Sequence, residues 1–83
     1  MGYYNVERHN IKTNLKWLRN RKALTIKAFS EQVGIKQGTY SVFESYGEGI
    51  SSERLKIIYD FYGITENDAI MKPEDFIKRF ESC

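Results

Sequence analysis

The sequence predicts an all-α fold of five or six short helices, and three observations support this prediction. Apolar residues recur at spacings of three and four along most of the chain, whereas no segment shows the strict alternation of a half-buried strand. Glycines and capping residues separate these periodic segments. The 83 residues are enough for one hydrophobic core and too few for two. We therefore expect a single domain over residues 1–83.

The first helix is predicted over residues 11–22, because its apolar side chains fall on one face. They are spaced by four and then three residues: Ile11, Leu15 and Leu18. Basic residues cover the other faces of this helix. Residues 1–10 show no such stripe, and we expect them to form a flexible N-terminal arm.

A second helix should follow Thr25, whose hydroxyl can accept a hydrogen bond from an amide one turn further on. The residues at helical spacing after it are Ile26, Phe29, Ser30 and Val33. Gly34 is expected to end this helix, since glycine enters the left-handed conformation without steric cost.

A third helix is predicted over residues 37–45, after a turn over residues 34–36. Tyr40 and Phe43 are three residues apart, so both can face inward. The outer face of the helix then carries Gln37, Gly38, Ser41 and Val42. Residues 46–49 are predicted to form a loop, because two of the four are glycines.

The fourth helix is expected to begin at a serine cap, Ser51 or Ser52, and to end at Gly63. Its inward stripe is Leu55, Ile58, Tyr59 and Tyr62. This pattern completes a helical core over residues 11–70 once a brief fifth helix is added. Thr65 and Asp68 have the spacing of a capping box and would open that helix.

The C-terminal segment, residues 71–83, is predicted to contain a last helix, because Pro73 suits a first helical turn. This end of the chain carries an apolar patch made of Ile70, Met71, Phe76, Ile77 and Phe80. The patch either pairs with a second copy about a two-fold axis or folds back onto its own core. The sequence leaves both arrangements open.

Charge is distributed unevenly along the chain. Residues 1–36 carry eight Lys and Arg against two Glu, a net charge of +6, whereas residues 37–83 carry five basic and nine acidic residues, a net charge of −4. Clustered basic residues gain affinity for a polyanion by displacing its condensed counterions. One end of the fold is therefore suited to a polyanion, although a solvated surface with segregated signs gives the same pattern.

The composition offers little for catalysis or metal binding. The single histidine, His9, falls in the expected arm, and the single cysteine, Cys83, has no Cys or His at metal-ligand spacing. We find neither a phosphate-binding glycine loop nor a nucleophile with a base. We therefore expect no enzyme, no metal and no cofactor, and no small-molecule effector is evident. The lone cysteine, with no membrane-spanning run or signal peptide, favours a reducing, cytoplasmic location and no membrane partner.

The spacing of the second and third helices is more specific than the fold class. Two helices of about two turns, joined by three residues beginning at Gly34, form the helix-turn-helix layout. In that layout the second helix enters the major groove of DNA. Ser30 is small enough for the two helices to cross closely, and Ile35 can fill the turn.

The chain then resembles the phage repressor and Cro proteins, the xenobiotic-response-element family of bacterial regulators. The matching segments are residues 15–19, 23–25, 29–35 and 40–44, together with Leu55, Ile58, Tyr59, Tyr62, Gly63 and Ile64. The resemblance covers about residues 11–70. It implies a lambda-repressor-like DNA-binding domain with a central helix-turn-helix.

The resemblance also implies a structural ion pair between Arg19 and Glu44, which would join the first helix to the end of the third. A guanidinium can hold a carboxylate through two parallel hydrogen bonds. The same resemblance makes three residues candidates for contacts with DNA phosphates: Lys27, Lys36 and Thr39.

Base readout is implied for four residues of the third helix: Gln37, Gly38, Ser41 and Val42. Gln37 can bond to N6 and N7 of adenine, and Val42 can touch a thymine methyl group. Two departures weaken this readout. Ile26 replaces a glutamine that is common in the family, and Gly38 supplies no side chain and costs about 1 kcal/mol of helix stability relative to alanine. Specificity would then rest on Gln37, on DNA shape, or on an arm with Tyr3, Tyr4, Arg8 and His9.

Two functions follow as hypotheses. The first is a sequence-specific regulator of transcription that binds double-stranded DNA, a repressor acting as a homodimer on two half-sites. The second is a protein-interaction module of helix-turn-helix shape, such as an antitoxin or adaptor. In that case exposed Trp17, Ile26 and Val42 would meet a protein partner.

Overall fold

The computed structural model describes residues 6–81, and six α-helices account for most of them. Their bounds are α1 Val6–Arg21, α2 Ile26–Val33, α3 Gln37–Tyr46, α4 Ser52–Tyr62, α5 Glu66–Ala69 and α6 Pro73–Phe80. No strand occurs within residues 6–81, and the all-α prediction is confirmed. None of these helices has both the length and the apolar character needed to cross a membrane.

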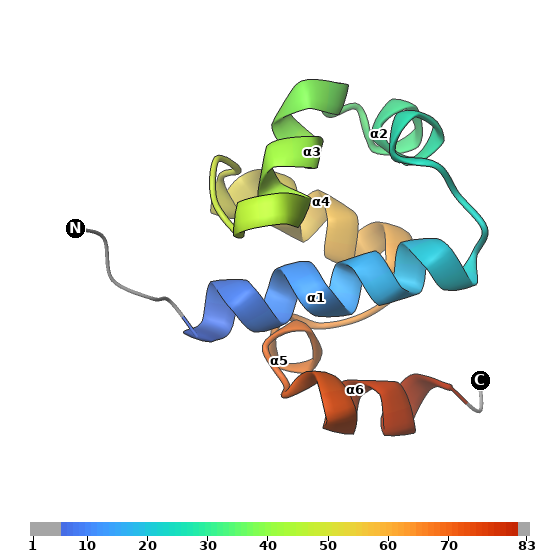
Figure 1. Ribbon diagram of the computed structural model, residues 1–83, viewed down its shortest axis with the longest axis vertical. Helices are drawn as coiled ribbons and strands as arrows, with labels where there is room; N and C mark the ends of the chain where they lie inside the picture. The colour runs from blue at the N-terminus through green and yellow to red at the C-terminus, as the bar shows by residue number, and fades with distance from the viewer. Residues whose placement is uncertain (1–5, 82–83) are drawn as a thin grey trace.

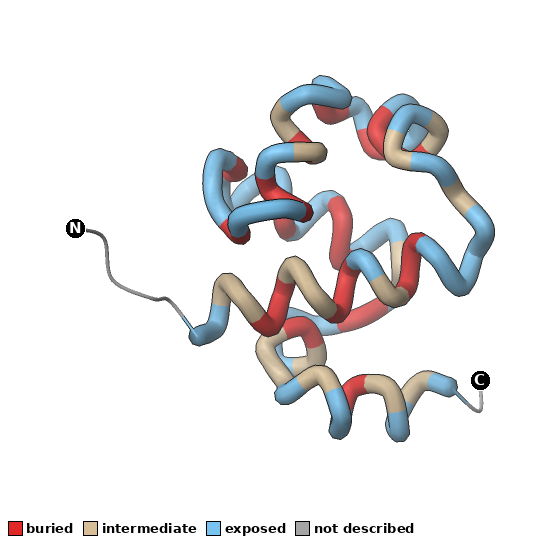
Figure 2. The backbone as a smooth tube through the Cα atoms, viewed as in Figure 1, coloured by how far each residue is buried: buried red, intermediate tan, exposed pale blue. Residues whose placement is uncertain are grey.

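Helix α1 runs through the middle of the molecule (Figure 1). Helices α2, α3 and α4 lie on one side of it, and α5 and α6 lie on the other. The buried residues fall on the inward faces of the helices (Figure 2), and the hydrophobic core takes side chains from all six of them. The same central helix therefore supports both the α2–α3 pair and the C-terminal helices.

The predicted helix boundaries depend mostly on local capping, and the structure contains these caps. The Thr25 hydroxyl accepts a hydrogen bond from the amide of Ala28 at 3.0 Å, which starts α2. Gly34 follows α2 with a φ of 71°, in the left-handed region where other residues are strained. The Thr65–Asp68 capping box opens α5, and Pro73 is the first residue of α6.

Helix α1 begins five residues earlier than predicted, at Val6 rather than Ile11. Residues 6–10 are helical, so the expectation of a flexible arm is wrong for them, including Arg8 and His9. Two long-range contacts secure these turns: the Arg8 guanidinium donates to the carbonyl of Ile50 at 3.0 Å, and the Asn10 amide donates to that of Ile70 at 3.1 Å. Tyr3 and Tyr4 lie outside the described residues.

The C-terminal helix folds back onto α1 of its own chain. Phe76 is completely buried, and its ring meets that of Trp17 edge-on, with centroids 6.0 Å apart. Trp17 is therefore half-buried, and the prediction of an exposed tryptophan is wrong. Of the two arrangements left open for the apolar patch, the structure contains the one in which Phe76 packs against the core.

Two asparagines of α1 hold α5 and the turn that follows it. The side-chain amide of Asn14 donates to the carbonyls of Ala69 and Met71, both at 2.9 Å, while Asn10 donates to the carbonyl of Ile70 between them. Carbonyls at the end of a helix lack partners within the helix. These contacts satisfy them, and they connect the C-terminal helices to the centre of the fold.

Candidate nucleic-acid interface

The turn between α2 and α3 fixes the relative orientation of these two helices. The amide of Ile35 donates to the carbonyl of Ser30 at 3.0 Å, and the Ile35 side chain is buried in the turn. Ser30 is only 2% exposed, as expected for a small residue where two helices pack closely. The rings of Phe29 and Tyr40 meet across the pair, with centroids 4.8 Å apart. The predicted helix-turn-helix is therefore present as a packed unit.

Helix α3 turns its predicted outer face away from the core. Tyr40 and Phe43 have no exposed surface, which leaves the opposite side of the helix to solvent. On that side Gln37, Gly38 and Val42 are exposed, and Ser41 is half-buried. All four residues proposed for base readout thus lie outside the core, at the surface of the first two turns of α3.

A buried ion pair joins α1 to the last turn of α3. The Nε and Nη2 atoms of Arg19 donate to the two carboxylate oxygens of Glu44 at 2.8 and 2.6 Å. The Nη1 atom of Arg19 donates to the carbonyl of Leu24 at 2.6 Å. The bond to Glu44 raises the pKa of Arg19 above its usual value. The pair therefore fixes α3, α1 and the segment that leads into α2 to one another.

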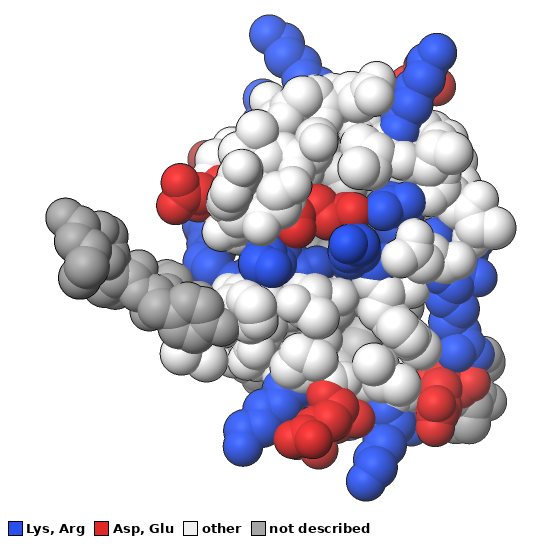
Figure 3. Space-filling model, viewed as in Figure 1, with Lys and Arg blue, Asp and Glu red and all other residues white. Residues whose placement is uncertain are grey.

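Two different surfaces flank the exposed ridge of α3. The first, which we call the basic flank, is a groove between α1 and the α2–α3 pair. It is lined by Lys12, Thr13, Lys16, Ile26, Ser41, Glu44 and Ser45. Figure 3 shows Lys and Arg side chains gathered along α1 next to α3. Because Arg19 holds the Glu44 carboxylate, the exposed charges of this flank come from lysines.

The second surface, which we call the apolar flank, lies on the other side of α3, beside the loop to α4. It is lined by Lys36, Gly38, Thr39, Val42 and Gly49, and apolar atoms form most of its surface. Lys36 is the residue just before α3, where its backbone is extended. Two proposed phosphate contacts, Lys36 and Thr39, therefore border this flank, while exposed Lys27 lies in the first turn of α2.

Sequence reasoning did not identify Lys12, Lys16 and Ser45 as candidate DNA contacts. Lys12 and Lys16 are four residues apart and so share one face of α1, which was a detectable signal. This face of α1 lies beside α3 because of how the two helices pack, and no local sequence pattern predicts that packing. Tyr46, also outside the predicted set, ends α3 and is 74% exposed.

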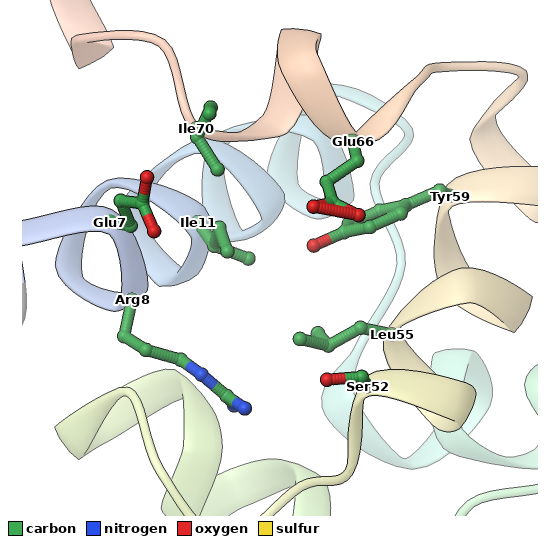
Figure 4. Close-up of a pocket in the computed structure, with 8 residues that line it drawn as sticks. All are labelled: Glu7, Arg8, Ile11, Ser52, Leu55, Tyr59, Glu66 and Ile70. Carbon is green, nitrogen blue, oxygen red and sulfur yellow. The ribbon is translucent and has the colours of Figure 1, made fainter.

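A further cavity, of about 150 Å³, lies away from α3, between α1, α4 and α5 (Figure 4). Its lining includes the carboxylates of Glu7 and Glu66, with Arg8 and Tyr59. Burial, with a contribution from Glu66, raises the pKa of Tyr59 to about 12. Two carboxylates make this cavity unfavourable for phosphate, so we do not include it in the interface.

In a comparison with known protein families, residues 15–68 match the model of a helix-turn-helix family. The chain belongs to the Cro/C1-type helix-turn-helix family. This family comprises DNA-binding regulators, and its match spans α2, α3 and α4 together with the C-terminal part of α1 and most of α5. No curated protein and no solved structure matches the chain.

This Cro/C1-type protein differs from the common family pattern at the start of α2. Ile26 occupies the position where a glutamine is frequent, and its half-buried side chain lines the basic flank next to Ser41. An isoleucine side chain cannot hydrogen-bond to a phosphate or to a neighbouring polar side chain. The polar contacts available at this flank come from α1 and from the serines of α3 instead.

Proposed function

We propose that this Cro/C1-type protein binds double-stranded DNA sequence-specifically and represses transcription as a homodimer. The observation that carries the proposal is the outer face of α3. It exposes a short polar and apolar ridge beside lysines, while its inner face is fixed in the core. An exposed helix of this kind can lie in a major groove, with basic residues against the two phosphate backbones.

In this proposal the residues of α3 have two roles. Gln37 bonds to a base edge, adenine N6 and N7 being the best match for its amide, while Ser41 and Val42 contact the bases one turn further on. Gly38 permits close approach of the α3 backbone to the DNA. Phosphate contacts are assigned to Lys27, Lys36 and Thr39, and we add Lys12 and Lys16 from the basic flank.

We include a homodimer in the proposal because a single recognition helix is short compared with a typical operator. One recognition helix covers about half of a typical operator, so two copies on half-sites one helical turn apart provide specificity and affinity together. Half-buried Ile77 and Phe80 of α6 are the candidate contacts between copies. Repression requires only that the bound dimer occupy a promoter. Sedimentation equilibrium with and without the selected duplex tests the dimer.

The decisive experiment is selection from a pool of random duplexes, followed by affinity measurements at several salt concentrations. Enrichment of one palindromic site and a steep loss of affinity with salt are expected. Lys12→Gln and Lys16→Gln should each reduce the slope of log affinity against log salt by about one. Lys56→Gln, an exposed lysine of α4, is the matched control and should leave the slope unchanged. Absence of duplex binding at low salt would contradict the proposal.

The protein-interaction alternative is weakened by the position of Trp17. This ring packs against Phe76 of α6, so it is not an exposed anchor for a partner. Of the other two proposed anchors, Val42 is exposed and Ile26 is half-buried. If the folded chain selects no duplex at low salt, a protein-interaction module becomes the better-supported function.

A further inference from the structure

The cavity between α1, α4 and α5 combines an apolar lining with an acidic rim. Buried Ile11 and Leu55, with half-buried Ile70, supply the apolar part. The carboxylates are those of Glu7 on α1 and Glu66 on α5, both at exposed positions. A molecule that fills this cavity therefore meets aliphatic side chains inside and negative charge at the opening.

Tyr59 is the residue of this cavity that lacks a polar partner. The two carboxylates each lie in the first turn of a helix, where negative charge is favourable, so they do not by themselves indicate a ligand. Tyr59 is only 7% exposed, and its hydroxyl extends from α4 toward α1 (Figure 4). No hydrogen bond joins this hydroxyl to another of residues 6–81. Because a buried tyrosine hydroxyl usually has a partner, the cavity is where that partner should bind.

We propose that this cavity binds a small organic cation, an ammonium group on a short hydrocarbon chain. An ammonium group has three N–H donors. It can donate to the hydroxyl oxygen of Tyr59 and to the carboxylate of Glu66, while Glu7 attracts it from the α1 side. The hydrocarbon chain then covers Ile11 and Leu55. This binding is separate from the proposed contact with DNA and does not depend on it.

Arg8 also lines the cavity, but it does not make the cavity a site for anions. Its guanidinium donates to the carbonyl of Ile50 at 3.0 Å. Figure 4 shows this group on the side of Ser52, away from Glu66. The lining contains two carboxylates and one guanidinium, a formal charge of −1. The end of the cavity beside Tyr59 and Glu66 therefore favours a cation.

The size and the lining of the cavity restrict the class of cation. Its volume of about 150 Å³ equals that of about five water molecules in the liquid, so a ligand of about five non-hydrogen atoms fits. A metal ion is a poorer match, because within residues 6–81 no three His, Cys, Asp or Glu side chains are grouped to hold one. Hard metal ions also take oxygen ligands, and the aliphatic lining offers none.

The test is a titration of the isotope-labelled 83-residue chain with n-butylammonium chloride, a probe of this size, followed by amide chemical shifts. We expect saturable shifts centred on Ile11, Leu55, Tyr59 and Ile70. Neutral n-butanol and anionic butyrate have the same hydrocarbon chain and should bind at least about tenfold more weakly, because they lack the charged donor. The melting temperature should rise with the concentration of butylammonium, since binding stabilises the folded chain.

Three variants separate this site from general attraction of cations to an acidic surface. Glu66→Gln should weaken butylammonium binding about tenfold, because it removes the charged acceptor. Tyr59→Phe keeps the ring but removes the hydroxyl, and should weaken binding about fivefold. Glu53→Gln is the matched control: this exposed carboxylate lies in the first turn of α4 and does not line the cavity, so its removal should change the affinity less than twofold. Circular dichroism checks that each variant is folded.

The inference is overturned if butylammonium gives no saturable shifts, if n-butanol binds as tightly, or if Glu66→Gln and Glu53→Gln lower the affinity equally. Saturation of the same amides by magnesium chloride would also overturn it, since the cavity would then select only charge. Duplex selection measures DNA binding independently, so none of these results decides the proposed function.

Discussion

Glu44 is the only carboxylate that lines the basic flank among the described residues, and its environment decides how that flank interacts with phosphate. The Glu44 side chain is 6% exposed and that of Arg19 is 10% exposed, so both charges are largely removed from water. The two hydrogen bonds between them offset this desolvation. A carboxylate held in this way repels an approaching phosphate less than a solvated one would.

Arg19→Ala should lower the free energy of unfolding by about 3–5 kcal/mol, because it leaves a buried carboxylate without its partner. Replacing both residues, as Arg19→Met with Glu44→Leu, should cost less than Arg19→Ala alone, since no buried charge remains. Urea denaturation of the two variants and the wild type measures these differences. A double variant less stable than Arg19→Ala would show that the charges themselves contribute net stability.

At the scale of helices, the sequence predicts a helix boundary correctly where a capping residue sets that boundary. Thr25, Gly34 and the Thr65–Asp68 box act within one helical turn, so their sequence spacing predicts the structure. The start of α1 could not be found this way, because Arg8 and Asn10 are held by carbonyls 42 and 60 residues away. For the site, the spacing of Tyr40 and Phe43 predicts the outer face of α3, but not which helix lies beside it.

Asn14 makes long-range polar contacts whose removal should lower the stability of the protein. Asn14→Ala removes two hydrogen bonds at 2.9 Å and leaves the carbonyls of Ala69 and Met71 without this donor. We expect a loss of about 2–3 kcal/mol in the free energy of unfolding. Amide hydrogen exchange should rise first in α5 and α6. Asn20→Ala, at an exposed position of the same helix, should change stability by less than about 0.5 kcal/mol. Uniform acceleration over all helices would contradict a local role.

For the whole molecule, the response to alkaline pH depends on two buried tyrosines, Tyr40 and Tyr59, and on half-buried Tyr62. Burial raises the pKa of Tyr40 and Tyr62 well above 10, and that of Tyr59 to about 12. Their contribution to stability is complete below pH 10, where both states are protonated. It is lost as the pH rises toward 12, because the unfolded chain then releases protons that the folded chain retains. We therefore expect these tyrosines to ionise together with unfolding.

Tyrosinate absorbance and circular dichroism, followed in one alkaline titration, test this coupling. The late part of the absorbance change should coincide with the loss of helix, and Tyr59→Phe should reduce its amplitude. Ionisation of all tyrosines near pH 10 with the helices intact would contradict the expected burial.

Because α6 lies far from α3, we predict that a change in α6 lowers stability without weakening DNA binding by α3. Helix α1 lies between them (Figure 1), and Phe76 is completely buried on the α6 side. Phe76→Ala should therefore cost about 3–5 kcal/mol in unfolding free energy. It should also shift the fluorescence of Trp17, the only tryptophan, to longer wavelength as its ring becomes exposed. Phe80→Ala, at a half-buried position, should cost less.

At a temperature where Phe76→Ala remains folded, its affinity for the selected duplex should stay within about twofold of wild type, because distant sites act independently. A large loss of affinity in the folded variant would mean that α6 contributes to DNA binding. The candidate contacts of Ile77 and Phe80 between copies would then be the first explanation to examine, since undocking α6 disturbs a dimer without touching α3.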